Sequence, residues 1–333
     1  MLISQMDKLL PCYTLFIILL CIESSISEGH CRIRTVSEDP LCVGEIKCTQ
    51  CIDDISKETL RWNCSGDYRL RLVIENLDFK HKSRLVNAQK IDERIYDNIE
   101  SITMTNEPQL KEIPFDIYEL FNGVKTIDLN NNAFNLIYLD NFLFYAYLER
   151  INVSNNKIVA LGINDHIRMG VTLNKVSSID LSFNRLNELY NESFQPFTRL
   201  RHLNLSNNDL KSLDEHAFLG LNNLKTLNLS QNKLQQIDLF LDPLVEIKEL
   251  YLDHNEIVSL MDFNFRSLAK LEILDVSSNK LVHIDALALH NLYKLYSLDL
   301  SNNTDCFSGE LTQKFYYYPE FSDRIFCEND NQI

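Results

Sequence analysis

The chain has 333 residues, of which 45% are hydrophobic, and it contains only 8 glycines and 7 prolines. This composition provides enough apolar side chains for a packed core and excludes collagen-like and low-complexity proteins. The formal net charge of −15 disfavours contact with phosphate backbones, so we expect no nucleic-acid partner.

The first 27 residues have the features of a secretory signal peptide. Lys8 precedes an apolar run over residues 9–22, and the small residues Ser25 and Ser27 suit cleavage after Ser27. The alternative is an uncleaved membrane anchor, but the run of 14 residues is shorter than the roughly 20 that span a bilayer. We therefore predict a secreted, extracellular protein with no membrane insertion after cleavage.

Residues 28–98 hold five of the seven cysteines of the mature chain, and the other two lie in residues 306–333. The sequence between these segments is repetitive, so we predict an N-terminal cap with an irregular first repeat region and a short C-terminal cap. In an oxidising compartment the cysteines would form disulfides that staple the caps. The disulfide candidates are Cys31, Cys42, Cys48, Cys51, Cys64, Cys306 and Cys327.

The cysteine pairing is only partly determined by the sequence. Cys306 and Cys327 form the natural C-terminal pair, whereas the five N-terminal cysteines make two bridges and leave one thiol over. That thiol is either buried or bound to another chain, which would give a disulfide-linked homo- or heteromer. The segment Cys48-Thr-Gln-Cys51 resembles half a zinc site, but no second such motif or paired His follows, so a disulfide is favoured there.

Residues 99–305 contain about nine repeats of 23–28 residues. The pattern L-x-x-L-x-L-x-x-N-x-L, with hydrophobic substitutions, opens at Val124, Leu148, Val176, Leu200, Leu224, Ile247, Leu271 and Leu295. The Asn of each copy falls in step, at Asn132, Asn156, Asn184, Asn208, Asn232, Asn255, Asn279 and Asn303. A weaker copy opens at Ile99, where Glu107 takes the Asn position. This regularity predicts a repeat architecture.

Each repeat supplies a short strand, because its central L-x-L alternation directs successive side chains to opposite faces. One strand cannot bury its apolar face alone, so stacked repeats form a parallel sheet over a continuous core. The turn after each strand leaves buried backbone groups, which an Asn amide satisfies because it both donates and accepts hydrogen bonds. We therefore interpret the repeat Asn as structural, and the second half of each repeat, such as residues 210–221, as packing the other side.

These motifs resemble those of the extracellular leucine-rich repeat superfamily over roughly residues 99–305. The resemblance implies an α/β repeat fold, namely a leucine-rich repeat solenoid (horseshoe) with a parallel concave β-sheet and disulfide-stapled terminal caps. Both caps depart from the family pattern in the number or spacing of their cysteines. The copy at Leu148 has extra chain within residues 162–174, either as an enlarged convex loop or as a partner contact.

We find no sequence signature of catalysis. No GxSxG, GxGxxG, Walker, HExxH or EF-hand pattern occurs, and no two of the eight histidines are spaced i, i+3 or i, i+4. We therefore predict that the protein is not an enzyme and that it has no cofactor and no metal site. Six N-x-S/T sequons make glycosylation candidates of Asn63, Asn152, Asn191, Asn204, Asn228 and Asn302.

The outward strand positions of a repeat protein form a broad, rigid ladder. Most of these positions are small and polar here, so the larger side chains are candidates for a partner-binding surface. They are Phe183, Arg201, His202, Tyr251, Asp253, His254, Asp275 and Tyr296. The alternatives are that these exposed aromatics are individually unremarkable surface residues, or that the caps or the convex side bind the partner.

The low-glycine, Asn- and Ile-rich repeats and the odd N-terminal cysteine resemble the secreted leucine-rich immune proteins of insects. The resemblance implies a circulating innate-immune factor that binds complement-like thioester proteins or microbial surfaces. Members of that group often carry a C-terminal coiled coil, which the six residues after Cys327 do not form. The sequence thus predicts an extracellular protein–protein recognition or scaffold factor. The alternatives are a developmental or cell-adhesion ligand of a cell-surface receptor and, less favoured, an enzyme inhibitor.

Overall fold

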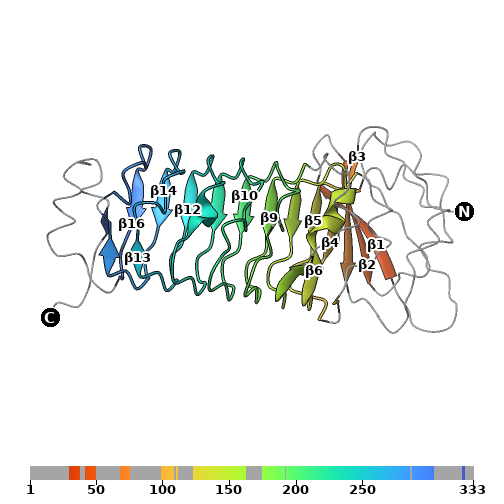
Figure 1. Cartoon of the computed structure of the whole chain (residues 1–333). Coiled ribbons are helices and arrows are strands. Elements are labelled where there is room, and N and C mark those ends of the chain that lie inside the picture. Colours follow the sequence, from red (N-terminus) through yellow and green to blue (C-terminus); the bar gives the residue numbers. More distant parts are fainter. Residues whose placement is uncertain are drawn as a thin grey trace, which may run out of the picture. The chain divides into compact units, whose positions relative to one another are not determined.

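The computed structural model describes residues 99–108, 110–111, 123–162, 175–191, 193–285 and 287–303, and the backbone of strands at 30–37, 42–49, 68–75 and 325–326. These residues belong to two compact units. The first comprises Met1–Ala133 with Phe144–Leu148, and the second Phe134–Leu143 with Glu149–Ile333. Figure 1 labels the strands of each unit.

The first unit contains a ladder of strands in the order β1-β2-β3-β4-β5. β1 is antiparallel to β2, and the later strands are parallel to their neighbours. The strands are β1 (His30–Ser37), β2 (Cys42–Thr49), β3 (Tyr68–Glu75), β4 (Ile99–Met104) and β5 (Thr126–Asp128). Cys31 lies opposite Cys48 in the β1–β2 register, whereas Cys51, Cys64, Cys306 and Cys327 lie outside the described residues. The disulfide assignments therefore stay predictions.

The second unit contains a parallel ladder in which consecutive repeats are neighbours, with β17 (Ile325–Phe326) following β16. One three-residue strand comes from each repeat: β7 (Arg150–Asn152), β9 (Ser178–Asp180), β10 (His202–Asn204), β11 (Thr226–Asn228), β12 (Glu249–Tyr251), β14 (Ile273–Asp275) and β16 (Ser297–Asp299). Leu203 is level with Leu227, and Leu250 with Leu274. The predicted solenoid of stacked parallel strands is thereby confirmed.

The core lies on the inward side of these strands. The middle residue of every strand is buried and its two neighbours are partly or fully exposed, which is the alternation that the L-x-L motif predicts. Behind the sheet, Phe194, Phe218 and Phe240 are fully buried. Their ring centroids are 6.3 and 6.0 Å apart from one repeat to the next, a spacing at which aromatic pairs contribute about 0.5–1.5 kcal/mol beyond their buried area.

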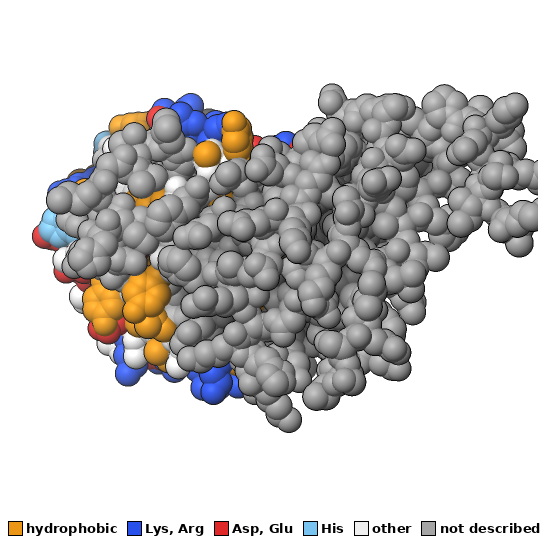
Figure 2. All heavy atoms as spheres, turned by 90° about the vertical axis from the view of Figure 1, so that its right-hand side faces the viewer, with side chains coloured by type: hydrophobic (Ala, Val, Ile, Leu, Met, Phe, Trp, Pro, Cys, Tyr) orange, Lys and Arg blue, Asp and Glu red, His pale blue; other side chains and the backbone are white. Residues whose placement is uncertain are grey.

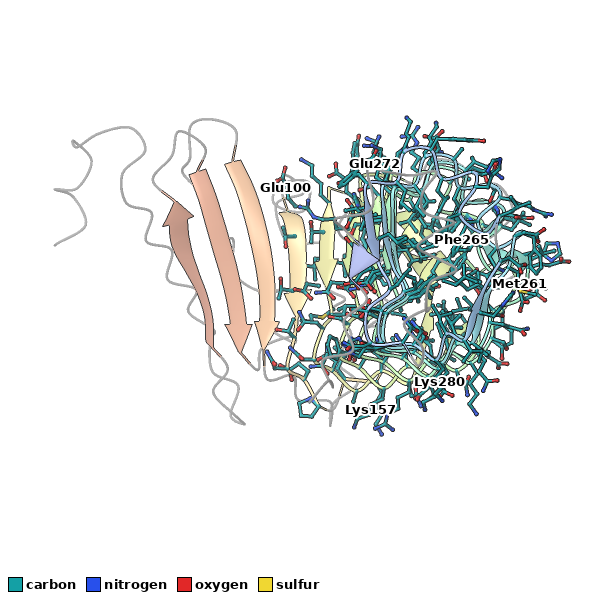
Figure 3. The ribbon with its side chains drawn as sticks, turned by 90° about the vertical axis from the view of Figure 1, so that its left-hand side faces the viewer. Glu100, Lys157, Met261, Phe265, Glu272 and Lys280 are labelled. Atoms are coloured by element: carbon teal, nitrogen blue, oxygen red, sulfur yellow. The ribbon has the colours of Figure 1, made fainter. Side chains whose placement is uncertain are left out.

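The remainder of each repeat is built from turns and short elements, and the described residues contain no α-helix. Figure 3 shows Met261 on the side away from β16 and Phe265 directed inward. The short elements are β6 (Leu136–Tyr138) paired with β8 (Ala160–Gly162), β13 (Ser259–Leu260) paired with β15 (His283–Ile284), and the 3-10 helices η2 (Leu139–Phe144) and η3 (Leu239–Leu241). The extra chain at 163–174 lies outside the described residues.

The repeat asparagines form the predicted structural column. The side-chain amide of Asn208 donates to the carbonyl oxygens of Leu205 in its own repeat and Leu181 in the preceding repeat, both at 3.0 Å. Its Oδ1 accepts a hydrogen bond from the backbone N–H of Leu186 at 2.9 Å. The same cross-repeat pattern is made by Asn184, Asn232, Asn255, Asn279 and Asn303.

Replacing Asn208 by Ala is expected to lower the free energy of unfolding by about 1–3 kcal/mol, because it leaves buried backbone groups without partners. Urea denaturation followed by circular dichroism measures the loss. Asn187→Ala is the matched control, because Asn187 is exposed and surface substitutions usually change stability by less than about 0.5 kcal/mol. Equal losses in both variants would contradict the structural role of the column.

Candidate partner-binding face

The outward sheet face of the second unit is formed by the first and third residue of each strand and by the second residue after it. These side chains are partly exposed in β9, β11, β12, β14 and β16. Neighbouring strands in a sheet lie about 4.8 Å apart, so equivalent side chains from successive repeats form rows across the face. One such row joins Tyr251, Asp275 and Asp299 through the β12–β14 and β14–β16 registers.

The third residue of most strands is Asp or Asn, and its side chain closes the turn that follows. Oδ1 of Asn228 accepts a hydrogen bond from the N–H of Ser230 at 2.9 Å. Oδ1 of Asp275 makes the same bond with Ser277, also at 2.9 Å. Since a neutral amide oxygen serves this turn as well as a carboxylate does, the turn does not require the negative charge at the Asp positions.

The next turn position has a left-handed backbone in every described repeat of the unit. Its φ is between 52° and 55° at Asn155, Phe183, Asn207, Gln231, His254, Ser278 and Asn302. Asn tolerates this region, whereas a bulky residue there is unusual. Phe183 adopts this conformation with φ 53° and has 56% of its surface exposed. The backbone conformation therefore does not account for an aromatic residue at this position.

The predicted partner-binding residues fall into two groups. The first group lies near β9 and β10 and consists of Phe183, Arg201 and His202, all of which are exposed. Nδ1 of His202 is 3.2 Å from the hydroxyl oxygen of Thr226. β11 separates this group from β12, so the eight predicted residues do not form one continuous cluster.

The second group lies on β12, β14 and β16 and contains the other five predicted residues, Tyr251, Asp253, His254, Asp275 and Tyr296. Burial raises the pKa of Tyr251, and the nearby charges of Glu249 and Asp275 raise it further. Nδ1 of His254 is 2.9 Å from a carboxylate oxygen of Asp253. The structure adds Glu249 and Asp299 to this group, because the strand register places them beside its other outward residues.

Negative charge is concentrated on these three strands. The outward positions of β12, β14 and β16 and of the turns that follow them hold Glu249, Asp253, Asp275 and Asp299, without a Lys or Arg. Burial raises the pKa of Asp275, and the carboxylates of Asp253 and Asp299 raise it further, although hydrogen bonds from Ser277 lower it. Asp275 is therefore a carboxylate whose charge is unfavourable in the isolated chain.

Five lysines beside the face are already paired at its two edges. One edge holds Lys225–Glu246 at 2.7 Å and Lys248–Glu272 at 2.5 Å, and Lys270 is also paired with Glu246 there. The other holds Lys280–Glu256 at 2.9 Å together with the Lys233–Asp209 pair. Figure 3 shows Glu272 and Lys280 at opposite edges. These pairs leave the outward carboxylates of Asp275 and Asp299 without an ion pair among the described residues.

The sequons occupy the other part of the sheet. Asn152, Asn204 and Asn228 lie at outward positions of β7, β10 and β11 and are partly exposed. The corresponding residues of β12, β14 and β16 are Tyr251, Asp275 and Asp299, which are not sequons. Asn191 is exposed away from the strands, Asn302 is exposed in the turn after β16, and Asn63 lies outside the described residues.

Exposed hydrophobic side chains also occur away from the sheet face. In the second unit, Tyr293, Leu287 and Val282 have 71%, 57% and 55% of their surface exposed. Figure 2 views the chain from the right-hand side of Figure 1 and shows hydrophobic side chains among acidic and basic ones. The described residues contain neither a group of three or more His, Cys, Asp or Glu placed to hold a metal ion nor a helix long and apolar enough to cross a bilayer.

Stacked parallel strands, a buried asparagine column and short elements behind the sheet define a repeat solenoid. The family model for the leucine-rich repeat matches residues 166–210, 198–242 and 245–304. The chain therefore contains leucine-rich repeats over these residues and has the fold of a leucine-rich repeat solenoid. A comparison with curated proteins finds no match.

Two solved structures are similar to this chain. The TLR13 chain in a complex with ssRNA13 is 21% identical, with 74% of this chain and 42% of that chain covered and a TM-score of 0.55. The structure of the Toll–Spatzle complex, described as a hub in Drosophila development and innate immunity, matches at 20% identity over 71% of this chain and 40% of the other, with a TM-score of 0.48. This chain thus spans less than half of either neighbour, and the first likeness shows the fold alone.

Asp275→Asn is expected to stabilise the folded chain at neutral pH. Asn keeps the oxygen that accepts the Ser277 N–H, as Asn228 does for Ser230, and it removes a charge whose pKa is raised. A raised pKa penalises the folded carboxylate, so the gain should be absent below the unfolded pKa of about 3.9 and grow as the pH rises through the folded pKa.

Urea denaturation of Asp275→Asn and of the parent chain at pH 3 and pH 7 measures this difference. Both chains are produced in cells that do not glycosylate, because Asp275→Asn creates an N-x-S sequon with Ser277. Asp262→Asn is the control with the same charge change at an exposed turn, where no such gain is expected. A gain at pH 3 as large as that at pH 7 would show that charge is not the cause.

Phe183→Asn is expected to raise the free energy of unfolding by up to about 1 kcal/mol, because Asn tolerates the left-handed backbone that disfavours other side chains by roughly 1–2 kcal/mol. Thermal and urea denaturation test this. Tyr293→Asn exchanges another exposed aromatic residue at a position without positive φ and should give no gain. A destabilised Phe183→Asn variant would mean that the ring contributes to packing.

Proposed function

We propose that this chain is an extracellular recognition protein that binds a protein partner on the outward sheet face of its second unit. The proposal rests on the outward side chains of seven parallel strands, which form rows across the sheet. Most of these side chains are small and polar, but Tyr251, Arg201 and Phe183 are large and at least partly exposed. Aromatic residues and Arg are enriched among the residues that dominate protein interfaces. A sheet built from stacked repeats presents such groups on a rigid scaffold.

A protein partner fits this face better than a nucleic acid does. The TLR13 chain with a similar fold was solved in a complex with RNA, so the fold by itself does not decide between the two kinds of ligand. In this chain, β12, β14 and β16 carry acidic outward residues, and the formal net charge is −15. Carboxylates repel a phosphate backbone, so we retain a protein partner and propose no nucleic-acid ligand.

We extend the proposal to secretion and to an innate-immune role. The apolar segment at residues 9–22 and the six sequons support a secreted glycoprotein. The resemblance to secreted leucine-rich immune proteins of insects supports a scaffold factor in extracellular fluid. A disulfide bond from one N-terminal cysteine to a partner would add covalent assembly, and it predicts a band that shifts between reducing and non-reducing gels.

The first experiment uses the full-length secreted chain as bait in extracellular fluid of the source organism and measures affinity for each captured protein by surface plasmon resonance. The double variant Phe183→Ala with Tyr251→Ala should weaken binding by about 2 kcal/mol or more, which is about thirtyfold. Tyr293→Ala, which removes a more exposed ring outside the sheet face, should bind like the parent. Unchanged affinity in the double variant would refute binding through this face.

A further inference from the structure

The outward face of β12, β14 and β16 differs from the rest of the sheet in charge and in aromatic content. It is defined by Glu249, Tyr251, Asp253, Asp275 and Asp299, with Tyr296 next to β16, and is called here the acidic–aromatic face. In the preceding four strands, the outward third residues are Asn152, Asp180, Asn204 and Asn228. The character of the sheet therefore changes between β11 and β12.

The charge of this face is not explained by the fold. Asn204 and Asn228 close the same turn that Asp275 and Asp299 close, with hydrogen bonds of 3.1, 2.9, 2.9 and 2.9 Å to the following Ser N–H groups. The neighbouring carboxylates of Asp253 and Asp299 disfavour the charge of Asp275, and burial does so more strongly. A residue that is unfavourable for the isolated chain, and replaceable within its turn, is suited to a binding role.

Among the described residues, two lysines at the edges of this face are already paired with other carboxylates. Lys248 is bound to Glu272 at 2.5 Å. Lys280 is bound to Glu256 at the opposite edge. An incoming cationic group would therefore meet carboxylates without an ion pair among the described residues, and its opposite charge would favour their ionised form.

Two tyrosines indicate which cation fits. Tyr251 is level with Asp275 in the strand register, and Tyr296 is close enough to affect the pKa of Tyr251. A planar guanidinium stacks on an aromatic ring and also makes two parallel hydrogen bonds with a carboxylate, whereas an ammonium group does neither as well. The row of Tyr251, Asp275 and Asp299 thus offers a ring beside carboxylates.

The sequons leave the same face accessible. Asn152, Asn204 and Asn228 would place glycans over β7, β10 and β11, while no sequon lies on a strand residue of β12, β14 or β16. The sequon at Asn302 lies in the turn after β16, at the edge of the face. The distribution of sequons on the strands is independent of the charges of the face, and it distinguishes the same three strands from the others.

We infer that the acidic–aromatic face docks an arginine-rich segment of a protein partner, with guanidinium groups on Tyr251 and Tyr296 and against Asp275 and Asp299. The inference deepens the proposed function and rests on it. It names the chemistry of the partner through charge complementarity and assigns binding to β12, β14 and β16.

The test measures binding of a synthetic nonapeptide of alternating Arg and Ser to the full chain by isothermal titration calorimetry at low and moderate salt. The parent should bind the Arg peptide more tightly than the corresponding Lys peptide and should not bind a Glu peptide. Asp275→Asn with Asp299→Asn should weaken binding of the Arg peptide by about tenfold or more. Tyr251→Ala should reduce the preference for Arg over Lys.

The matched control is Asp214→Asn with Asp262→Asn, which changes the net charge equally at exposed positions away from the sheet face. All chains are produced without glycosylation, because Asp275→Asn and Asp299→Asn both create N-x-S sequons. Equal weakening in both double variants would overturn the inference, because it would show only general attraction to an acidic protein. Absence of Arg-peptide binding by the parent would also overturn it.

Binding of the native partner to the two double variants distinguishes this inference from the proposed function. If Phe183→Ala with Tyr251→Ala loses that partner while Asp275→Asn with Asp299→Asn binds it normally, the proposed function stands and the arginine-docking inference fails. If both double variants bind the partner normally, both proposals fail.

Discussion

The buried asparagine column is the interaction on which the rest of the structure depends. Each amide joins the turn of its own repeat to the turn of the preceding one, as Asn232 does through the carbonyl oxygens of Leu229 and Leu205. Without these bonds the chain could not reverse direction inside an apolar core, because unpaired backbone groups there are unfavourable. Constant strand register follows from the column, and the rows on the outward face follow from the register.

Most of the fold could be predicted from the sequence because its rule is local and repeated. Leucines two residues apart define each strand, and an Asn three residues after the second leucine defines each turn. Behind the sheet, turns and short strands such as β13 form the second half of the repeats in the described residues. That part of the repeat is constrained only to bury residues such as Phe218, and several backbone paths satisfy this requirement.

The candidate site could be predicted only in part. Bulky residues such as Tyr251 and Phe183 stand out in the sequence against small neighbours, but Glu249 and Asp299 are ordinary for their positions when each repeat is considered alone. Their importance depends on which charges lie across the strands and on which lysines are already paired, as Lys248 is with Glu272. These relations join residues about 24 positions apart, and a motif within one repeat does not contain them.

The left-handed turn after each strand has a practical consequence for changing what the protein displays. In the second unit the same backbone conformation is held by Asn, Phe, Gln, His and Ser, with backbone groups of the turn bonded between repeats, as Asn207 N–H is to the carbonyl oxygen of Ser230. The chain path is thus independent of the side chain at this position. Different side chains can therefore occupy these turns along one edge of the sheet, and new binding specificities can be introduced there without redesign of the scaffold.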